Sequence, residues 1–331
     1  MSVGPKKLSD AEQPAEHRTP PLQFSGFLGE IVPHGGNRVL NRLVCQPIKG
    51  LDSVFLFTLP EHDTHQTVCP RDRERSSKMF ETGLVSISFR QLSPRQLAAL
   101  CARNHLRWIE WGSDIHAPYC DTLRLTEIIA LQEEFHLQCS SYGTYFKLGQ
   151  DDTQELRRYI HAAKSLGTHI LRLWCGSKNY EDMTLEERAR ILSESKKAAA
   201  IAEEAQVVLC LECHNNTFTN CLEGARTLME SVNSPAFRMY WQPNQFHDLE
   251  WNLEYARNIG KYTEIIHVFN WEGHNKYPLA DACAIWTQYL ACFDGRQKLL
   301  LEFMPDNLPE SLETEAGSLE RIRSSHIKHR K

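Results

Sequence analysis

The chain of 331 residues lacks several features that would assign it to a specialised class. It has no apolar run near the roughly 18 residues that a membrane span needs, and no apolar segment follows the two lysines of its first ten residues, as it would in a signal peptide. Neither a G-x-G-x-x-G turn nor a P-loop occurs. These absences favour a cytoplasmic protein and count against a membrane partner.

A strong charge of one sign is also missing, and so is a disulfide framework. The formal net charge is -5, which does not favour nucleic acid as a partner. The 11 cysteines are odd in number and many lie within apolar runs, as is typical of reduced thiols in a core. Cys210 and Cys213 form a C-x-x-C on an expected strand, where residues three apart face opposite sides, so the pair does not indicate a zinc or redox site.

Residues 1–78 differ in composition from the rest of the chain. They contain eight prolines, a Gly-Gly pair and no sustained helical or strand period, and their one apolar island is 54–59. We therefore expect an irregular or disordered N-terminal extension over 1–78 and a single domain over 79–331 that folds without it.

From Met79 onward, short apolar runs alternate with amphipathic helical segments. Ser93 with Gln96, and Thr184 with Glu187, have the spacing of capping boxes and mark two helix starts. The eight expected strands are 83–89, 106–111, 137–142, 168–174, 207–212, 237–241, 265–269 and 298–303.

Eight strand-helix units in the 253 residues from Met79 to the end predict an α/β fold, a (β/α)8 TIM barrel. Strictly alternating units build a parallel sheet, and this length is typical of such a barrel. An open doubly wound sheet is the alternative. It usually carries a glycine-rich turn after its first strand, which this chain lacks.

Polar side chains interrupt the apolar runs at the ends of the last four expected strands. These residues are Glu212, Gln242, His267 and Glu302. In a TIM barrel the active site lies at the C-terminal ends of the strands, so the four side chains are expected to meet there.

Two buried glutamates need a cation, because an unpaired buried carboxylate costs several kcal/mol. Oxygen ligands with one imidazole suit Mn²⁺, Mg²⁺, Co²⁺ or Zn²⁺. The alternative is a salt-bridge network without metal, in which Glu212 and Glu302 pair with Arg172 and Lys147.

The order of the segments resembles that of a known family, the xylose isomerase-like TIM barrel superfamily with its sugar phosphate isomerase/epimerase branch. The resemblance runs from Gly83 to near Asp306 and is carried by LVSISFR, IEWGSDIHAP, SSYGTYFKLG, ILRLWCG, LCLECHNNTFT, YWQPN, IIHVFNW and LLLEF. It implies a divalent metal, with Mn²⁺ expected first, held by a Glu on strand five, an acid on strand six, a His on strand seven and a Glu on strand eight. These positions correspond to Glu212, Gln242, His267 and Glu302.

The resemblance implies an isomerase or epimerase that moves a proton next to a carbonyl of a sugar, sugar phosphate or inosose, through an enediolate. Glu212 and Glu302 would then be the proton-transfer pair as well as metal ligands. Gln242 departs from the family, which usually has Asp there and His three residues on, where this chain has Gln245. An amide oxygen can still coordinate, but the ligand charge falls from about -3 to about -2, so metal binding should be weaker.

Further side chains near the strand ends are candidates for substrate contacts. By strand alternation His214 points the same way as Glu212. Arg172 could hold a phosphate or carboxylate, or pair with Glu212. The expected substrate-binding residues are His214, Glu110, His116, Arg172, Trp174 and Asn270.

Three other functions compete with an isomerase. A lyase or hydrolase of keto-sugars or glycosides could use the same barrel, and the departure at Gln242 leaves room for a non-catalytic sugar-binding barrel. A DNA-repair enzyme of the endonuclease IV type would need three zinc ions and a basic rim, whereas acidic residues outnumber basic ones by six beyond residue 78. A small sugar or polyol is the expected partner, and the resemblance implies a homodimer or tetramer.

Overall fold

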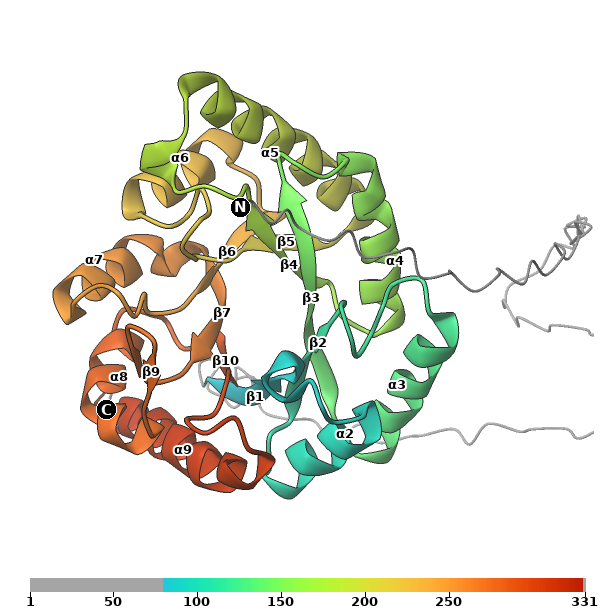
Figure 1. The fold of residues 1–331 in the computed structure, drawn as a ribbon, viewed down its shortest axis with the longest axis vertical. Coiled ribbons are helices and arrows are strands. Elements are labelled where there is room, and N and C mark those ends of the chain that lie inside the picture. The colour runs from blue at the N-terminus through green and yellow to red at the C-terminus, as the bar shows by residue number, and fades with distance from the viewer. Residues whose placement is uncertain (1–79, 330–331) are drawn as a thin grey trace, which may run out of the picture. The chain divides into compact units, whose positions relative to one another are not determined.

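The computed structural model describes residues 80–329, with side chains to 326. Eight parallel strands close into a barrel in the order β1-β10-β7-β6-β5-β4-β3-β2, and the helices surround it (Figure 1). This arrangement confirms the predicted TIM barrel. The prediction of an irregular extension over 1–78 lies outside the described residues.

The barrel strands and the helices around them alternate along the chain. The strands are β1 (Glu81–Val85), β2 (Trp108–Gly112), β3 (Gln138–Leu148), β4 (Ile170–Cys175), β5 (Val208–Leu211), β6 (Phe237–Trp241), β7 (Thr263–Val268) and β10 (Lys298–Leu301). The helices are α2 (Pro94–Arg103), α3 (Thr122–Glu134), α4 (Leu156–Ser165), α5 (Leu185–Ala205), α6 (Leu222–Val232), α7 (Leu249–Ile259), α8 (Cys283–Leu290) and α9 (Leu312–His329). None of the described helices is long and apolar enough to cross a membrane.

Both predicted capping boxes are present. Ser93 accepts a hydrogen bond from the backbone of Gln96, whose side chain accepts one from the Ser93 backbone, and the helix α2 begins at the next residue. Thr184 and Glu187 do the same at the start of α5. These local signals set where two of the helices start.

The first strand is shorter than predicted. β1 ends at Val85, and 86–89, expected to continue it, forms a 3-10 helix. The hydroxyl oxygen of Ser86 accepts a hydrogen bond from the backbone of Gly112, and that of Ser88 from the backbone of Phe303. Side chains thus replace the strand ladder here, and since all four residues stay buried, the apolar pattern alone looked like a strand.

The fifth strand ends at Leu211, so the prediction that Cys210 and Cys213 share one strand was wrong. Cys213 lies beyond the strand, where its sulfur is 3.3 Å from the backbone nitrogen of Gln242. A two-stranded hairpin, β8 (Trp271–Glu272) and β9 (Asn275–Lys276), was not predicted.

The apolar core has two parts. The larger part lies between the strands and the helices. The smaller one comes from strands and the turn after β1, and it fills the inside of the barrel with Val85, Ile87, Ile170, Cys210, Tyr240, Ile265 and Leu300. Because side chains alternate along a strand, the residues two positions after Ile170, Cys210, Tyr240, Ile265 and Leu300 point inward as well.

Candidate active site

The four residues predicted as metal ligands lie together at the C-terminal ends of adjacent strands. Glu212 follows β5, Gln242 follows β6, His267 is the second-to-last residue of β7, and Glu302 follows β10. None of them is more than 9% exposed. The barrel therefore brings together residues that are up to 90 positions apart in the sequence.

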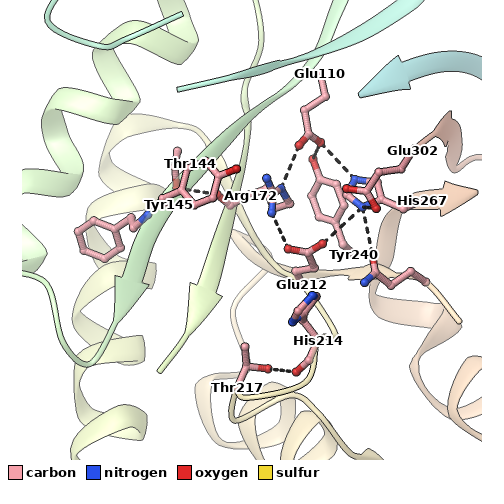
Figure 2. A network of polar contacts seen from close by, with 12 residues as sticks. Glu110, Thr144, Tyr145, Arg172, Glu212, His214, Thr217, Tyr240, His267 and Glu302 are labelled. Carbon is pink, nitrogen blue, oxygen red and sulfur yellow. Dashed lines mark hydrogen bonds and ion pairs between the residues drawn. The ribbon is translucent and has the colours of Figure 1, made fainter. Parts of the chain in front are cut away.

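The Nδ1 atom of His267 is the meeting point of this group. It lies 3.4 Å from Oε2 of Glu302 and 3.5 Å from Oε1 of Glu212 (Figure 2). Oε1 of Gln242 is 3.1 Å from the same nitrogen. Two ligands bound about 2.1 Å from one metal ion are about 3.0 Å apart in octahedral and about 3.4 Å apart in tetrahedral geometry. The spacing and the donor types therefore fit a divalent metal, and Glu212, His267 and Glu302 form such a group by ligand-atom distance as well.

Arg172, on β4, ties Glu212 to a second buried glutamate. Its Nη1 donates to Oε2 of Glu212, and its Nε donates to Oε1 of Glu110 at 2.9 Å. All three side chains are at most 3% exposed. Only one oxygen of Glu212 thus faces His267, while the other is held by the guanidinium.

Glu110, on β2, accepts further hydrogen bonds from the adjacent strand β3 and from β6 across the barrel. Its Oε2 accepts hydrogen bonds from the hydroxyls of Ser141 at 3.0 Å and Tyr240 at 2.9 Å. Nε2 of His267 lies 3.5 Å from the same oxygen. The two ring nitrogens of His267 therefore face different partners, with Nδ1 toward the predicted ligands and Nε2 toward Glu110.

Charges inside the network shift the titration of its members. Burial favours the neutral form of Glu110, but the Arg172 charge, His267 and further contacts together outweigh it and lower the pKa of that carboxyl to about 2. The pKa of Glu212 is lowered for the same reasons. Burial lowers the pKa of His267, yet the surrounding carboxylates, Glu302 first, raise it well above its usual value.

The charge balance of the network suits a divalent cation. Three carboxylates face one arginine, so two negative charges are left when His267 is neutral. A divalent ion would balance them, and without it protonation of His267 would supply part of the missing charge.

His214 and Trp174 lie beside this group. Their ring centroids are 4.7 Å apart with the ring planes tilted by 35°, and the charge of His214 contributes to the lowered pKa of Glu212. Nδ1 of His214 is 2.8 Å from the carbonyl oxygen of Asn215. The structure thus brings four of the six expected substrate-binding residues, these two with Glu110 and Arg172, to the candidate site.

His116 and Asn270 are placed apart from the network. The ring nitrogens of His116 lie 3.2 Å from Ser86 Oγ and from the carbonyl oxygen of Leu92, and burial lowers its pKa to about 4. The Asn270 amide donates to the carbonyl of Pro278 at 2.9 Å. Among the described contacts, neither side chain touches a predicted metal ligand.

Two members of the network, Tyr240 and Ser141, were missed in the sequence. Tyr240 stands two residues before Gln242, so strand alternation places both on the same side and could have found it. The predicted alternative of a salt-bridge network is half present. Arg172 pairs with Glu212, but in the described part of the chain Lys147 makes no ion pair with Glu302.

A cavity of about 460 Å³ lies at the other end of the barrel, where Trp108, Gln138 and Lys298 begin their strands. TIM barrels carry their catalytic groups at the C-terminal ends of the strands. We therefore place the candidate active site at the polar network.

Known proteins match this chain through family and fold. The model of the xylose isomerase-like TIM barrel family matches residues 98–293. No curated protein matches the sequence significantly.

Similar solved structures share the fold at low sequence identity. The probable 3-DHS dehydratase AsbF from Bacillus anthracis has a TM-score of 0.63 and 16% identity over 73% of this chain and 99% of its own. The IolI protein with a binding zinc atom has a TM-score of 0.60 and 16% identity over 75% of this chain and 99% of its own. D-psicose 3-epimerase with D-tagatose from Clostridium cellulolyticum H10 has a TM-score of 0.59 and 13% identity over 75% of this chain and 99% of its own. Since the family model covers more than half of the chain, the protein belongs to the xylose isomerase-like TIM barrel family.

Proposed function

We propose that this chain is a divalent-metal-dependent isomerase or epimerase acting on a sugar, a sugar phosphate, an inosose or a related polyol. The observation that carries the proposal is one imidazole nitrogen with three oxygens within 3.5 Å, at the ends of four adjacent strands. An epimerase with D-tagatose and a protein with a zinc atom, both of this fold, support the class of reaction and the metal.

Glu212, Gln242, His267 and Glu302 would hold the ion, with Mn²⁺ as the first candidate. When bound, such an ion polarises the substrate carbonyl and stabilises the negative charge that develops on its oxygen. The near-complete burial of these side chains excludes water from the reacting atoms and so strengthens every electrostatic contact there.

Proton transfer is assigned to the two glutamates. Glu212 has one oxygen committed to Arg172, whereas among residues 80–326 no lysine or arginine forms an ion pair with Glu302. We therefore propose Glu302 as the base that removes the proton from the carbon next to the carbonyl. Return of this proton to the former carbonyl carbon, with the proton of the adjacent hydroxyl passing to the former carbonyl oxygen, gives the isomer. For an epimer, Glu212 would take up a proton from solvent and deliver it to the opposite face of the same carbon, while Glu302 releases its own proton to solvent.

The mouth beside the ligands offers a surface for the sugar itself. The neighbouring rings of His214 and Trp174 would contact its hydroxyls and one face of the sugar. A small sugar or polyol is the partner we propose, while a cytoplasmic location and a homo-oligomer stay predictions from the sequence.

Metal analysis combined with a thermal-shift screen tests the proposal. The purified full chain, freed of metal by a chelator, is melted with and without Mn²⁺ and with ketoses, inososes and their phosphates. At 100 times its dissociation constant, Mn²⁺ should stabilise the fold by about 2.7 kcal/mol, and a turned-over ketose should give a product of unchanged mass. Loss of water or of an aglycone would instead indicate a lyase or hydrolase. Absence of bound metal together with an unchanged melting temperature would end the metal-enzyme proposal.

A further inference from the structure

Glu110 lies outside the proposed ligand set, yet its contacts lead to two members of it. It is fully buried on β2, on the opposite side of the barrel from β6 and β7. Oε1 accepts from Arg172, which holds Glu212, and Oε2 lies 3.5 Å from Nε2 of His267. One carboxylate therefore contacts both Arg172, which holds Glu212, and His267, which is itself a proposed metal ligand (Figure 2).

We propose that Glu110 is a positioning residue that determines how His267 and Glu212 present their atoms to the metal. The inference rests on the proposed function, because it concerns the same metal site. It adds a role for a residue that touches neither the metal nor the reacting atoms.

The first effect is on the tautomer of His267. A neutral imidazole carries one N–H, and an ionised carboxylate can only accept. Glu110 therefore keeps the proton on Nε2, and the lone pair of Nδ1 is left for the ion amid the oxygens of Gln242, Glu212 and Glu302. Carboxylates that bind the second nitrogen of a ligand histidine orient the ring and raise its basicity in this way.

The second effect passes through Arg172. The guanidinium is a rigid planar fork, so fixing its Nε on Glu110 also fixes the direction of Nη1, which holds Oε2 of Glu212. Oε1 of Glu212 then remains as a single ligand atom facing the site. Without this hold both oxygens of Glu212 could turn toward the ion.

Gly143 on β3 leaves the space that this arrangement needs. A Cβ atom there would lie 2.4 Å from Oε1 of Glu110 and 3.1 Å from Nη2 of Arg172. Any side chain at this position would displace the pair. The contact between Glu110 and Arg172 therefore requires glycine at position 143.

The test replaces Glu110 by glutamine and measures metal binding directly. Glu110→Gln keeps the shape, but its single amide oxygen cannot accept from both Arg172 and His267. Co²⁺ alone is the probe, titrated into the metal-free full chain and followed by visible absorption. We expect affinity to fall about 10- to 100-fold. In the Zn²⁺-loaded protein, ¹⁵N NMR should show His267 as the Nε2–H tautomer in the wild type and a changed or mixed state in the variant.

Glu315→Gln is the matched control. Glu315 is a buried carboxylate, 5% exposed, that accepts from the backbone of Leu279 and has no contact with the network. The same substitution there should leave Co²⁺ affinity and the His267 tautomer unchanged.

Arg172→Lys tests the route to Glu212 and serves if Glu110→Gln does not fold. Lysine keeps the charge but cannot hold Glu110 and Glu212 as a fork, so Co²⁺ affinity should fall about tenfold. The double variant should lose less than the product of the single losses, because both changes break one chain of contacts. The inference is overturned, while the proposed function stands, if Glu110→Gln keeps wild-type Co²⁺ affinity and an unchanged His267 tautomer. It is likewise overturned if Arg172→Lys keeps wild-type Co²⁺ affinity. A wild-type chain that binds no Co²⁺ overturns the proposed function as well.

Discussion

The two ends of the barrel interior differ in chemistry over a distance of two residues. At the N-terminal end the inward positions are mostly apolar, and the next inward position on the same strand is polar or charged. This change occurs from Ile170 to Arg172, from Cys210 to Glu212, from Ile265 to His267 and from Leu300 to Glu302.

The two ends contribute differently to the free energy of folding. Burial of aliphatic side chains stabilises the fold, by about 1.5–3 kcal/mol for each large residue. Buried charges instead lose their hydration, and a buried ion pair regains this only when its geometry is good. The buried charges of the polar end are therefore not explained by folding stability. Substitutions at the two ends should separate an effect on activity from an effect on stability.

Glu302→Gln at the polar end should have the largest effect, and on activity. Removal of a general base typically costs about 10²- to 10⁴-fold in rate, so we expect a loss near ~10³-fold in kcat, measured by NMR on a ketose that the wild type turns over. Glu264→Gln is the control. Glu264 lies near the N-terminal end of β7, the strand next to β10, where it binds Arg238 and is 28% exposed. Equal loss in both variants would contradict a special role of the polar end.

Leu300→Ala, two residues before Glu302, should affect stability instead. Leu300 is fully buried inside the barrel, and truncation of such a residue lowers the free energy of unfolding by about 2–5 kcal/mol. Urea unfolding measures this loss. Leu123→Ala, at a side chain that is 84% exposed, is the control and should stay within about 0.5 kcal/mol. Well below its melting temperature, Leu300→Ala should keep most of the wild-type kcat. A loss of kcat as large as that of Glu302→Gln would contradict the division of roles.

The polar end should also make the metal-free protein sensitive to acid. The pKa of Glu110 is lowered from 4.5 to about 2 in the folded chain. A carboxyl whose pKa is lower in the folded than in the unfolded chain stabilises the fold at pH values above its unfolded pKa. This stabilisation is lost as the pH falls toward its folded pKa. Between pH 4.5 and 2, wild type should thus lose about 3 kcal/mol more than Glu110→Gln. Parallel urea-unfolding curves against pH for the two proteins would refute this.

Much of the fold could be predicted because its signals are local. Alternating apolar runs and the capping boxes at Ser93 and Thr184 depend only on near neighbours in the chain. The segment 86–89 was predicted as a strand because its apolar pattern continues. The hydrogen bonds of Ser86 and Ser88 that end β1 come from Gly112 and Phe303, which are 26 and 215 positions away in the sequence.

The meeting of side chains at the strand ends could be predicted from the sequence, whereas Tyr240 and Ser141 were missed and the contacts within the network could not be predicted. Position at a strand end was enough to select Glu212, His267 and Glu302. The contact between Glu110 and His267 joins residues 157 positions apart across the barrel. It depends on strand tilt and stagger, which no single strand encodes.

Gln242→Asp should have the smallest effect of the four changes, and in the opposite direction. Gln242 directs Oε1 to Nδ1 of His267 at 3.1 Å, so a carboxylate there would raise the ligand charge from about -2 to about -3 and tighten Mn²⁺ binding by about tenfold. Isothermal titration of the metal-free protein measures this. Gln245→Asp adds the same charge three residues on, in the loop after β6, and should leave affinity nearly unchanged. If both variants gain equally, the charge acts through the general field rather than as a ligand. If Gln242→Asp alone gains nothing, the side chain at 242 is not a ligand, and the polar end binds its ion with Glu212, His267 and Glu302 only.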